Sequence, residues 1–180
     1  MQEEIEQKIR EVAHYQARLF HEIPKIETFV REIVKCYRHN KKILVCGDEY
    51  PSPAVQDMVY SFINMSKEKR NPLEIMAINT NAPPLRLFQR QIKTYEEEGD
   101  ILFGLSTTGT PRELIRTFKK GKEIGTINLS LTGNNGGKLK EISDYNINVD
   151  AKEDSRIKET HMVLYDIIYE LVGKKLFHEL

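Results

Sequence analysis

The sequence predicts an α/β fold, a three-layer αβα sandwich with a parallel five-stranded sheet, preceded by an N-terminal helical pair. Two observations predict it. Short apolar runs alternate with longer segments of helical periodicity, and 180 residues are enough for one substantial core. Strands that alternate with helices pair in parallel. We expect a single domain over residues 1–180, with N-terminal helices over 1–40 and the αβα core over 41–180.

Five apolar runs are the expected strands. They span residues 41–47, 73–78, 101–105, 126–132 and 145–149, and the last alternates polar and apolar residues as a half-buried or edge strand does. Ligands of such folds bind beyond the carboxyl ends of the strands. The loops 47–53 and 106–110 both begin there.

The helices follow from apolar residues three and four positions apart. The N-terminal pair is joined near residues 21–24. Two later helices are expected to bury Val55, Met58, Phe62 and Met65, and Leu85, Phe88, Ile92 and Tyr95. The last helix carries one stripe of Ile157, His161, Leu164, Ile168 and Leu171. It is apolar almost all round, so we expect it to lie between the sheet and another subunit.

Composition excludes several classes. Lys and Arg together number 27, as do Asp and Glu, so the zero net charge disfavours direct nucleic-acid binding through bulk electrostatics. Cys36 and Cys46 are not spaced as a metal or redox pair and are expected to be buried thiols of a reducing cytosol. Neither a signal core nor a membrane-spanning stretch is visible. We therefore expect a cytoplasmic protein that does not insert into a membrane.

The central stretch is Ile101-Leu-Phe-Gly-Leu-Ser-Thr-Thr-Gly-Thr-Pro-Arg-Glu113. A buried strand breaks there into hydroxyl residues before a helix, which Thr110 and Glu113 are expected to cap as a capping box. Free N–H groups and the positive end of the helix dipole favour an anion at such a point. We predict a phosphate or sugar site made of Ser106, Thr107, Thr108, Gly109 and Thr110, with Ser52 from the first loop. The alternative is a capped turn that binds nothing.

Other polar residues are weaker catalytic candidates. Asp48 and Glu49 form an acidic pair that could do acid–base work on a sugar, although surface charges are the simpler interpretation. Asp57 and Ser61 lie one turn apart and could face a shared cleft. His161 could serve as a base, but its place on an apolar stripe favours a core or interface histidine.

Four segments carry a family resemblance: Lys42-Ile-Leu-Val-Cys-Gly47, Gly99-Asp-Ile-Leu-Phe-Gly-Leu-Ser-Thr-Thr-Gly109, Leu131-Thr-Gly-Asn-Asn-Gly-Gly-Lys138 and Ser155-Arg-Ile-Lys-Glu-Thr-His161. In this order they resemble a SIS (sugar isomerase) domain of the phosphoheptose isomerase branch. The resemblance implies a homotetramer with sites at subunit interfaces. It also implies that Ser106, Thr107 and Thr108 hold a sugar phosphate.

The catalytic positions of that branch have changed. Its first loop reads Gly-Asn-Gly-Gly-Ser, whereas this chain has Gly47-Asp-Glu-Tyr-Pro51. The resemblance places the metal ligands and base of the branch at Asp57, Ser61, Lys158 and Asp166, and a phosphate-loop serine at Pro111. Of the four metal-site residues only the two aspartates suit zinc, so we expect no metal and no cofactor. The resemblance thus implies a fold that has lost isomerisation.

Five shorter segments resemble the DiaA group of this branch, whose members associate with the replication initiator DnaA. They are Met1-Gln-Glu-Glu-Ile5, Ile63-Asn64, Glu68-Lys-Arg70, Ala77-Ile-Asn-Thr80 and Leu176-Phe-His178. This resemblance implies a non-enzymatic tetramer that gathers DnaA molecules. Leu176 and Phe177 are then the candidate partner-binding residues, although packing onto the core is the favoured interpretation of two apolar residues there.

Three functions remain open. The first is a non-catalytic SIS scaffold for a partner protein, with DnaA as the candidate, which can also bind a phosphosugar. The second is a sedoheptulose 7-phosphate isomerase or related aldose–ketose isomerase whose base has moved to Glu49 or Asp57. The third is a phosphosugar sensor.

Overall fold

The computed structural model describes residues 1–48, 52–64, 73–78 and 87–177. The elements, in chain order, are α1 (Gln2–Arg18), the 3-10 turn η1 (Leu19–Glu22), α2 (Ile23–Arg38), β1 (Ile43–Gly47), α3 (Pro53–Asn64), β2 (Ile75–Ala77), α4 (Leu87–Tyr95), β3 (Ile101–Ser106), α5 (Arg112–Ile124), β4 (Ile127–Gly133), α6 (Gly137–Ile142), β5 (Tyr145–Val149) and α7 (Asp154–Phe177). The five predicted strands and the N-terminal helical pair are confirmed.

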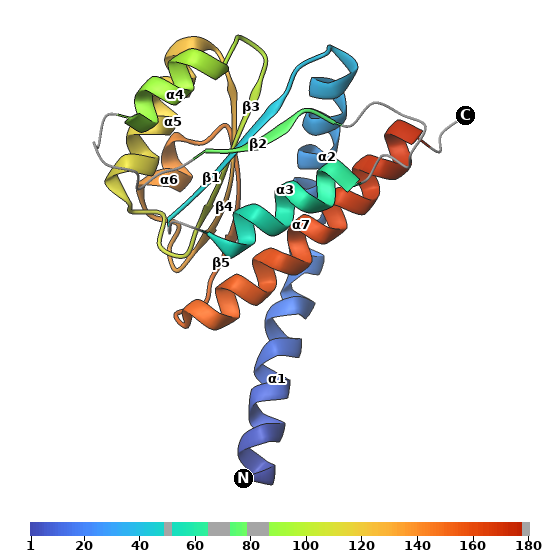
Figure 1. Cartoon of the computed structure of the whole chain (residues 1–180). Coiled ribbons are helices and arrows are strands. Elements are labelled where there is room, and N and C mark those ends of the chain that lie inside the picture. The colour runs from blue at the N-terminus through green and yellow to red at the C-terminus, as the bar shows by residue number, and fades with distance from the viewer. Residues whose placement is uncertain (49–51, 65–72, 79–86, 178–180) are drawn as a thin grey trace.

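The five strands form one sheet in the order β2-β1-β3-β4-β5, and every neighbouring pair is parallel. Alternate side chains of each strand enter different layers. In β1, Ile43 and Val45 belong to the cluster that includes residues of α2, α3 and α7, whereas Leu44 and Cys46 belong to the cluster with α4, α5 and α6. Figure 1 shows the same division, with a helical layer on each face of the sheet. The three-layer αβα sandwich is therefore confirmed.

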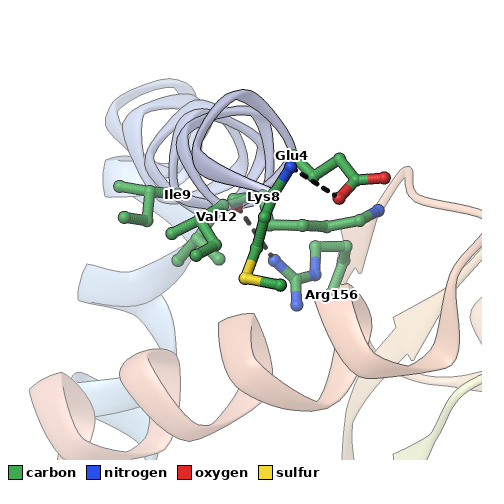
Figure 2. A pocket seen from close by; sticks show the side chains of 7 residues that line it. Glu4, Lys8, Ile9, Val12 and Arg156 are labelled. Atoms are coloured by element: carbon green, nitrogen blue, oxygen red, sulfur yellow. Dashed lines mark hydrogen bonds and ion pairs between the residues drawn. The ribbon is translucent and has the colours of Figure 1, made fainter.

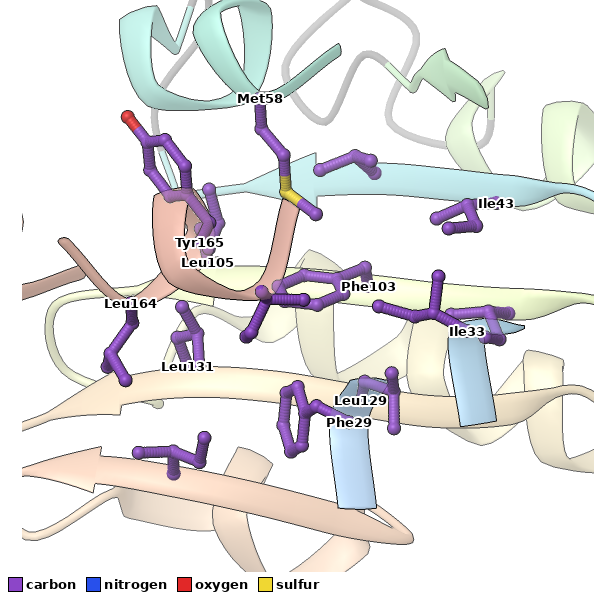
Figure 3. Close-up of a cluster of buried hydrophobic side chains, with 14 of the residues drawn as sticks. Phe29, Ile33, Ile43, Met58, Phe103, Leu105, Leu129, Leu131, Leu164 and Tyr165 are labelled. Atoms are coloured by element: carbon purple, nitrogen blue, oxygen red, sulfur yellow. The ribbon is translucent and has the colours of Figure 1, made fainter. Parts of the chain in front are cut away.

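The larger core lies between the sheet and the layer of α2, α3 and α7 (Figure 3). Phe103 of the central strand is fully buried there, and its ring meets that of Phe29 edge-to-face at a centroid distance of 5.7 Å. Such aromatic pairs add to the stabilisation that burial itself supplies. This core fixes the central strand, and with it the loop that follows Ser106.

The N-terminal helical pair forms a long arm rather than a compact hairpin. Helix α1 has no buried residue and extends away from the sandwich, with the N-terminus at its far end (Figure 1). Helix α2, in contrast, buries a stripe against the sheet that includes Phe29 and Ile33. The arm is tied to α7 by a bond from Arg156 Nη1 to the carbonyl of Lys8.

One prediction about a buried residue needs correction, and three others fall outside the described side chains. Tyr95 is 46% exposed, because α4 ends at this residue and the following turn carries Glu96 inward instead. Leu171, on the predicted stripe of α7, is 39% exposed and borders a hollow between α2 and α7. The side chains of Met65, Leu85 and Phe88 lie outside the described part of the chain. Val55, Met58, Phe62 and Ile92 are buried as predicted.

Both cysteines are free and buried, as predicted. Burial raises the pKa of the Cys36 thiol to about 12, so it is not a reactive thiolate. Within the described residues, no helix combines the length and apolar character needed to cross a bilayer.

A buried polar group fastens the amino ends of β1 and β3. Asp100 is fully buried, and its carboxylate pairs with Lys42 Nζ at 2.6 Å and accepts from the backbone N–H groups of Lys42 and Glu97. Nearby, both carboxylate oxygens of Glu96 are buried without a hydrogen bond in the structure. Burial, reinforced by the charge of Asp100, raises the pKa of Glu96 to about 8. Glu96 is therefore mostly protonated in the folded protein at neutral pH.

Replacing Phe103 with Ala should lower the free energy of unfolding by roughly 3–5 kcal/mol, because the substitution leaves a cavity in the larger core. Urea unfolding followed by circular dichroism measures this. Tyr60→Ala is the matched control, since Tyr60 is 70% exposed. Its effect should stay within about 0.5 kcal/mol. Equal effects of the two substitutions would contradict the assignment of the core.

Glu96 should make stability fall as pH rises. Its pKa is about 8 in the folded state against 4.5 for a solvent-exposed glutamate, so the folded state holds a proton that the unfolded state has released. From about pH 6 to about pH 8 the free energy of unfolding should therefore fall by roughly 2 kcal/mol on account of this group. Glu96→Gln should remove that slope in urea unfolding. Glu97→Gln, at a neighbouring exposed carboxylate, should keep it.

Candidate functional site

The candidate site lies where the carboxyl ends of β1, β3 and β4 meet. Ser106 ends β3, and the loop 107–111 leads from it to α5. Two hydrogen bonds join this loop to the segment after β4. Asn134 Nδ2, in the turn, donates to the carbonyl of Thr107 at 3.0 Å, and Leu139 N, in α6, donates to the carbonyl of Gly109 at 2.9 Å. The site is therefore a fixed surface made by two loops.

Gly109 allows the two loops to touch. It has a positive φ of 68°, and a Cβ at this position would lie 1.9 Å from the carbonyl oxygen of Gly136. No L side chain fits such a contact. The predicted site residue Gly109 is thus required by the loop geometry itself.

Asp48 projects into the hydroxyl loop. Its Oδ2 accepts from the Ser106 hydroxyl and from the Thr107 backbone N–H, each at 2.8 Å. The Ser106 hydroxyl in turn accepts from Gly109 N at 2.6 Å. A carboxylate of the chain is therefore bound to two of the groups predicted to hold a phosphate. The interpretation of Asp48 as a surface charge is wrong, because its carboxylate is an integral part of the loop.

The threonines of the loop bond to each other. The hydroxyls of Thr108 and Thr110 are 2.8 Å apart, and Thr110 N donates to Thr108 Oγ1 at 3.3 Å. The capping-box prediction is wrong: α5 begins at Arg112 after Pro111, without a side-chain cap among the described residues. The Thr110 hydroxyl serves Thr108 instead, and Glu113 pairs with Arg116. Amide groups of the first turn of α5 remain without a side-chain cap beside this loop.

Ser52 caps the helix that follows the first loop. Its hydroxyl accepts from Val55 N at 3.4 Å, and the side chain is half-buried. The catalytic candidate Glu49 lies outside the described residues, as do Tyr50 and Pro51.

The changed metal-site positions lie on α3 and α7. Tyr165 donates its hydroxyl to Asp57 Oδ2 at 2.7 Å, and burial together with this bond raises the pKa of Tyr165. Burial, with the charge of Asp57, also raises the pKa of Asp166, which places the two carboxylates in one neighbourhood. Ser61 is half-buried and Lys158 is exposed.

This donor set does not suit zinc. Structural and catalytic zinc sites need three or four imidazole, thiolate or carboxylate ligands. Among the residues that the structure describes, no three His, Cys, Asp or Glu side chains are grouped so as to hold a metal ion. The two aspartates are accompanied by the Tyr165 hydroxyl, which is not among the usual zinc ligands.

His161 lies in the core. It is 3% exposed, and its Nε2 contacts the carbonyl of Thr132 at 3.2 Å; because a carbonyl only accepts, Nε2 carries the proton. Burial lowers the pKa of His161 to about 4, so the ring is neutral at physiological pH. This placement supports the core interpretation of His161 over a catalytic one.

The two partner-binding candidates end α7. Leu176 is half-buried and packs against the larger core, and Phe177 is half-buried as well. They are thus neither fully buried nor fully exposed.

The chain is an α/β protein with a parallel αβα sandwich whose central strand ends in a hydroxyl loop beside a helix N-terminus, the edge at which ligands of open α/β sheets commonly bind. The family follows from sequence comparison. A family model described as the SIS domain matches residues 8–133. The chain therefore belongs to the SIS domain family, and the predicted resemblance to its phosphoheptose isomerase branch is confirmed.

Relatives and solved structures agree with this assignment. A protein of Thermodesulfovibrio yellowstonii named phosphoheptose isomerase is 32% identical, with 97% of this chain and 94% of that protein covered. A phosphoheptose isomerase of Clostridium acetobutylicum is 29% identical, with 87% and 85% covered. The solved phosphoheptose isomerase of Francisella tularensis superposes with a TM-score of 0.87 at 19% identity, covering 96% of this chain and 97% of that one. At this identity the superposition shows the fold alone.

Replacing Asp48 with Asn should increase affinity for sugar phosphates at least tenfold. The substitution removes a negative charge bonded to the loop, and two unit charges about 4 Å apart repel by roughly 4 kcal/mol at an effective dielectric constant near 20. Calorimetric titration with sedoheptulose 7-phosphate measures the change. Glu97→Gln makes the same charge change beyond the amino end of β3 and should leave affinity as in the wild type. Tighter binding by the wild type than by Asp48→Asn would contradict the role given to Asp48.

Proposed function

We propose that this chain is a non-catalytic SIS-domain protein that works by binding a partner protein. The observation that carries the proposal is the Asp48 carboxylate, which is bonded to the Ser106 hydroxyl and the Thr107 N–H. A sugar phosphate has to displace this carboxylate or bind beside it. In the first case binding breaks the two hydrogen bonds that the carboxylate accepts, and in the second the ligand lies beside a negative charge.

The surroundings of Asp57 support the same proposal. An aldose–ketose isomerisation needs a base within hydrogen-bond reach of the substrate carbon that loses its proton. In this chain the Asp57 carboxylate already accepts a bond from Tyr165, and His161 is buried against Thr132. One oxygen of the Asp57 carboxylate is therefore engaged by Tyr165, and the His161 ring lies in the core.

The partner we propose is the replication initiator DnaA, with a homotetramer in the cytoplasm as the scaffold. The proposal rests on the sequence resemblance to DiaA and on the half-buried state of Leu176 and Phe177. An apolar side chain that is partly covered at the end of a helix retains surface for a second protein. Phosphosugar binding in the hydroxyl loop is compatible with this role. The protein would then also be a phosphosugar sensor.

The second candidate is a phosphosugar isomerase. Relatives named phosphoheptose isomerase, which match most of this chain, favour this candidate. In this case Glu49 or Asp57 would act as the base without zinc.

We expect no conversion of sedoheptulose 7-phosphate by the purified protein, with or without added zinc. Among the described residues, the Asp48 and Asp57 carboxylates both accept hydrogen bonds within the chain, and no metal donor set is grouped. A product assay against an active phosphoheptose isomerase measures this. Turnover that Asp57→Asn abolishes would establish the isomerase instead.

Purified DnaA should bind the immobilised protein, and Phe177→Ala should weaken binding at least fivefold through loss of apolar contact area. Tyr60→Ala, at an exposed aromatic residue of α3, is the matched control and should bind as the wild type does. Absence of DnaA binding by the wild type would remove this partner. Equal binding by all three proteins would show that Phe177 is not in the contact.

A further inference from the structure

Helix α4 lies on the face of the sheet opposite α2 and α7 (Figure 1) and contributes to the smaller core, the buried cluster that includes Cys46, Ile92 and Phe118. Among the α4 side chains that the structure describes, only Ile92 is buried. Glu96 follows four positions later and is 6% exposed, and its backbone N–H donates to the carbonyl of Ile92 at 2.9 Å. Residues four apart lie on one side of a helix. An apolar and an acidic side chain therefore share the face by which α4 meets the sheet.

The carboxyl group of Glu96 is buried without a partner. Both of its oxygens lack a hydrogen bond among the residues that the structure describes. The two lysines nearby are engaged elsewhere, since Lys42 Nζ pairs with Asp100 at 2.6 Å and Lys41 Nζ pairs with Glu97 at 3.5 Å. A carboxylate buried without a cation or a donor is costly, and such a group holds a proton instead. The seat of α4 on the sheet thus depends on a neutral Glu96.

The charges around Glu96 come from the strands as well as from its own turn. Burial and the charge of Asp100, just before β3, raise the pKa of Glu96 to about 8, while Lys42, just before β1, lowers it. Glu96 also lies close enough to Cys46 of β1 for its charge to raise the pKa of that thiol, after burial. The other charged groups at this end of the sandwich are Lys41, Lys93, Glu97, Glu98 and Glu123. Burial is thus the main reason why Glu96 is neutral.

The turn after Glu96 is fastened independently of that side chain. The Asp100 carboxylate accepts from the N–H of Glu97 at 2.8 Å, and Gly99 N donates to the carbonyl of Gly125 at 3.1 Å. These bonds hold the chain from Glu97 onward whether or not Glu96 stays in place. A segment with few buried side chains opens at a lower free energy than the whole domain does. Helix α4 can therefore leave the sheet about a hinge between positions 96 and 97.

We propose that α4 is a proton-controlled cover of the smaller core: loss of the Glu96 proton releases α4 from the sheet while the strands and the larger core stay folded. In the released form the carboxylate reaches water, where its charge is hydrated. The closed form holds the proton and the open form has lost it, so opening becomes more favourable as pH rises toward 8 and levels off above. The proposal does not rest on the proposed function.

The two cysteines of the chain allow a direct comparison of the two cores. Cys46 lies in the smaller core with Ile92, whereas Cys36 lies in the larger core, and both thiols are free. The full chain is labelled with iodoacetamide at pH 6 and pH 8, and mass spectrometry gives the rate at each thiol. Each rate is divided by that of the urea-unfolded chain at the same pH, which removes the effect of thiol ionisation. At pH 8, Cys46 should react at least tenfold faster than Cys36 on this scale.

The pH dependence identifies the controlling group. The scaled rate at Cys46 should rise roughly tenfold or more from pH 6 to pH 8 in the wild type, because the open form gains population as Glu96 ionises. In Glu96→Gln, which carries no charge at either pH, the rate should change less than twofold. Glu97→Gln is the matched control at an exposed carboxylate and should keep the full rise. Hydrogen exchange of the α4 amides in the wild type should follow Cys46 without any substitution.

Three results would overturn the proposal. Equal scaled rates at Cys46 and Cys36 at pH 8 would show that α4 separates only when the whole chain unfolds. A Cys46 rate that is independent of pH, or that rises equally in Glu96→Gln, would remove Glu96 as the controlling group. Labelling of Cys46 without exchange of the α4 amides would place the opening in another element of the smaller core.

Discussion

The hydrogen bonds from Ser106 and Thr107 to Asp48 are the constraint on which the candidate site depends. They join the carboxyl ends of β1 and β3, which are separated by 58 positions in the sequence. A buried or half-buried carboxylate is costly unless hydrogen bonds compensate its lost hydration. The loop supplies those bonds, so the carboxylate and the loop stabilise each other. Any ligand that uses the same donors competes with an interaction that the fold already makes.

The loop around this contact has little freedom to adapt. The backbones of Gly109 and Gly136 lie too close together for a side chain at position 109, and the side chain of Asn134 donates a hydrogen bond to the carbonyl of Thr107. A site whose backbone is fixed before binding loses little conformational entropy when a ligand arrives. The same rigidity means that the site cannot easily move away from the charge of Asp48. This SIS-domain chain therefore combines a rigid hydroxyl loop with a negative charge bonded inside it.

Sequence periodicity was sufficient for the fold because it reports directly on burial. The five apolar runs became five parallel strands, and the last, alternating run became the edge strand β5. The interactions of the site were not accessible in the same way. The bond between Tyr165 and Asp57 spans 108 positions, and the role of Asp48 depends on the register of β1 against β3. The capping box failed for a local reason, since Thr108 competes for the Thr110 hydroxyl.

The two helices of the N-terminal arm differ in what stabilises them. Helix α1 buries none of its residues, whereas α2 is anchored in the larger core. An isolated helix of this length is marginal in water. The backbone of α1 is therefore the part of the described chain whose helical order depends least on the core and most on contacts at its surface, such as the bond from Arg156 to the carbonyl of Lys8 (Figure 2).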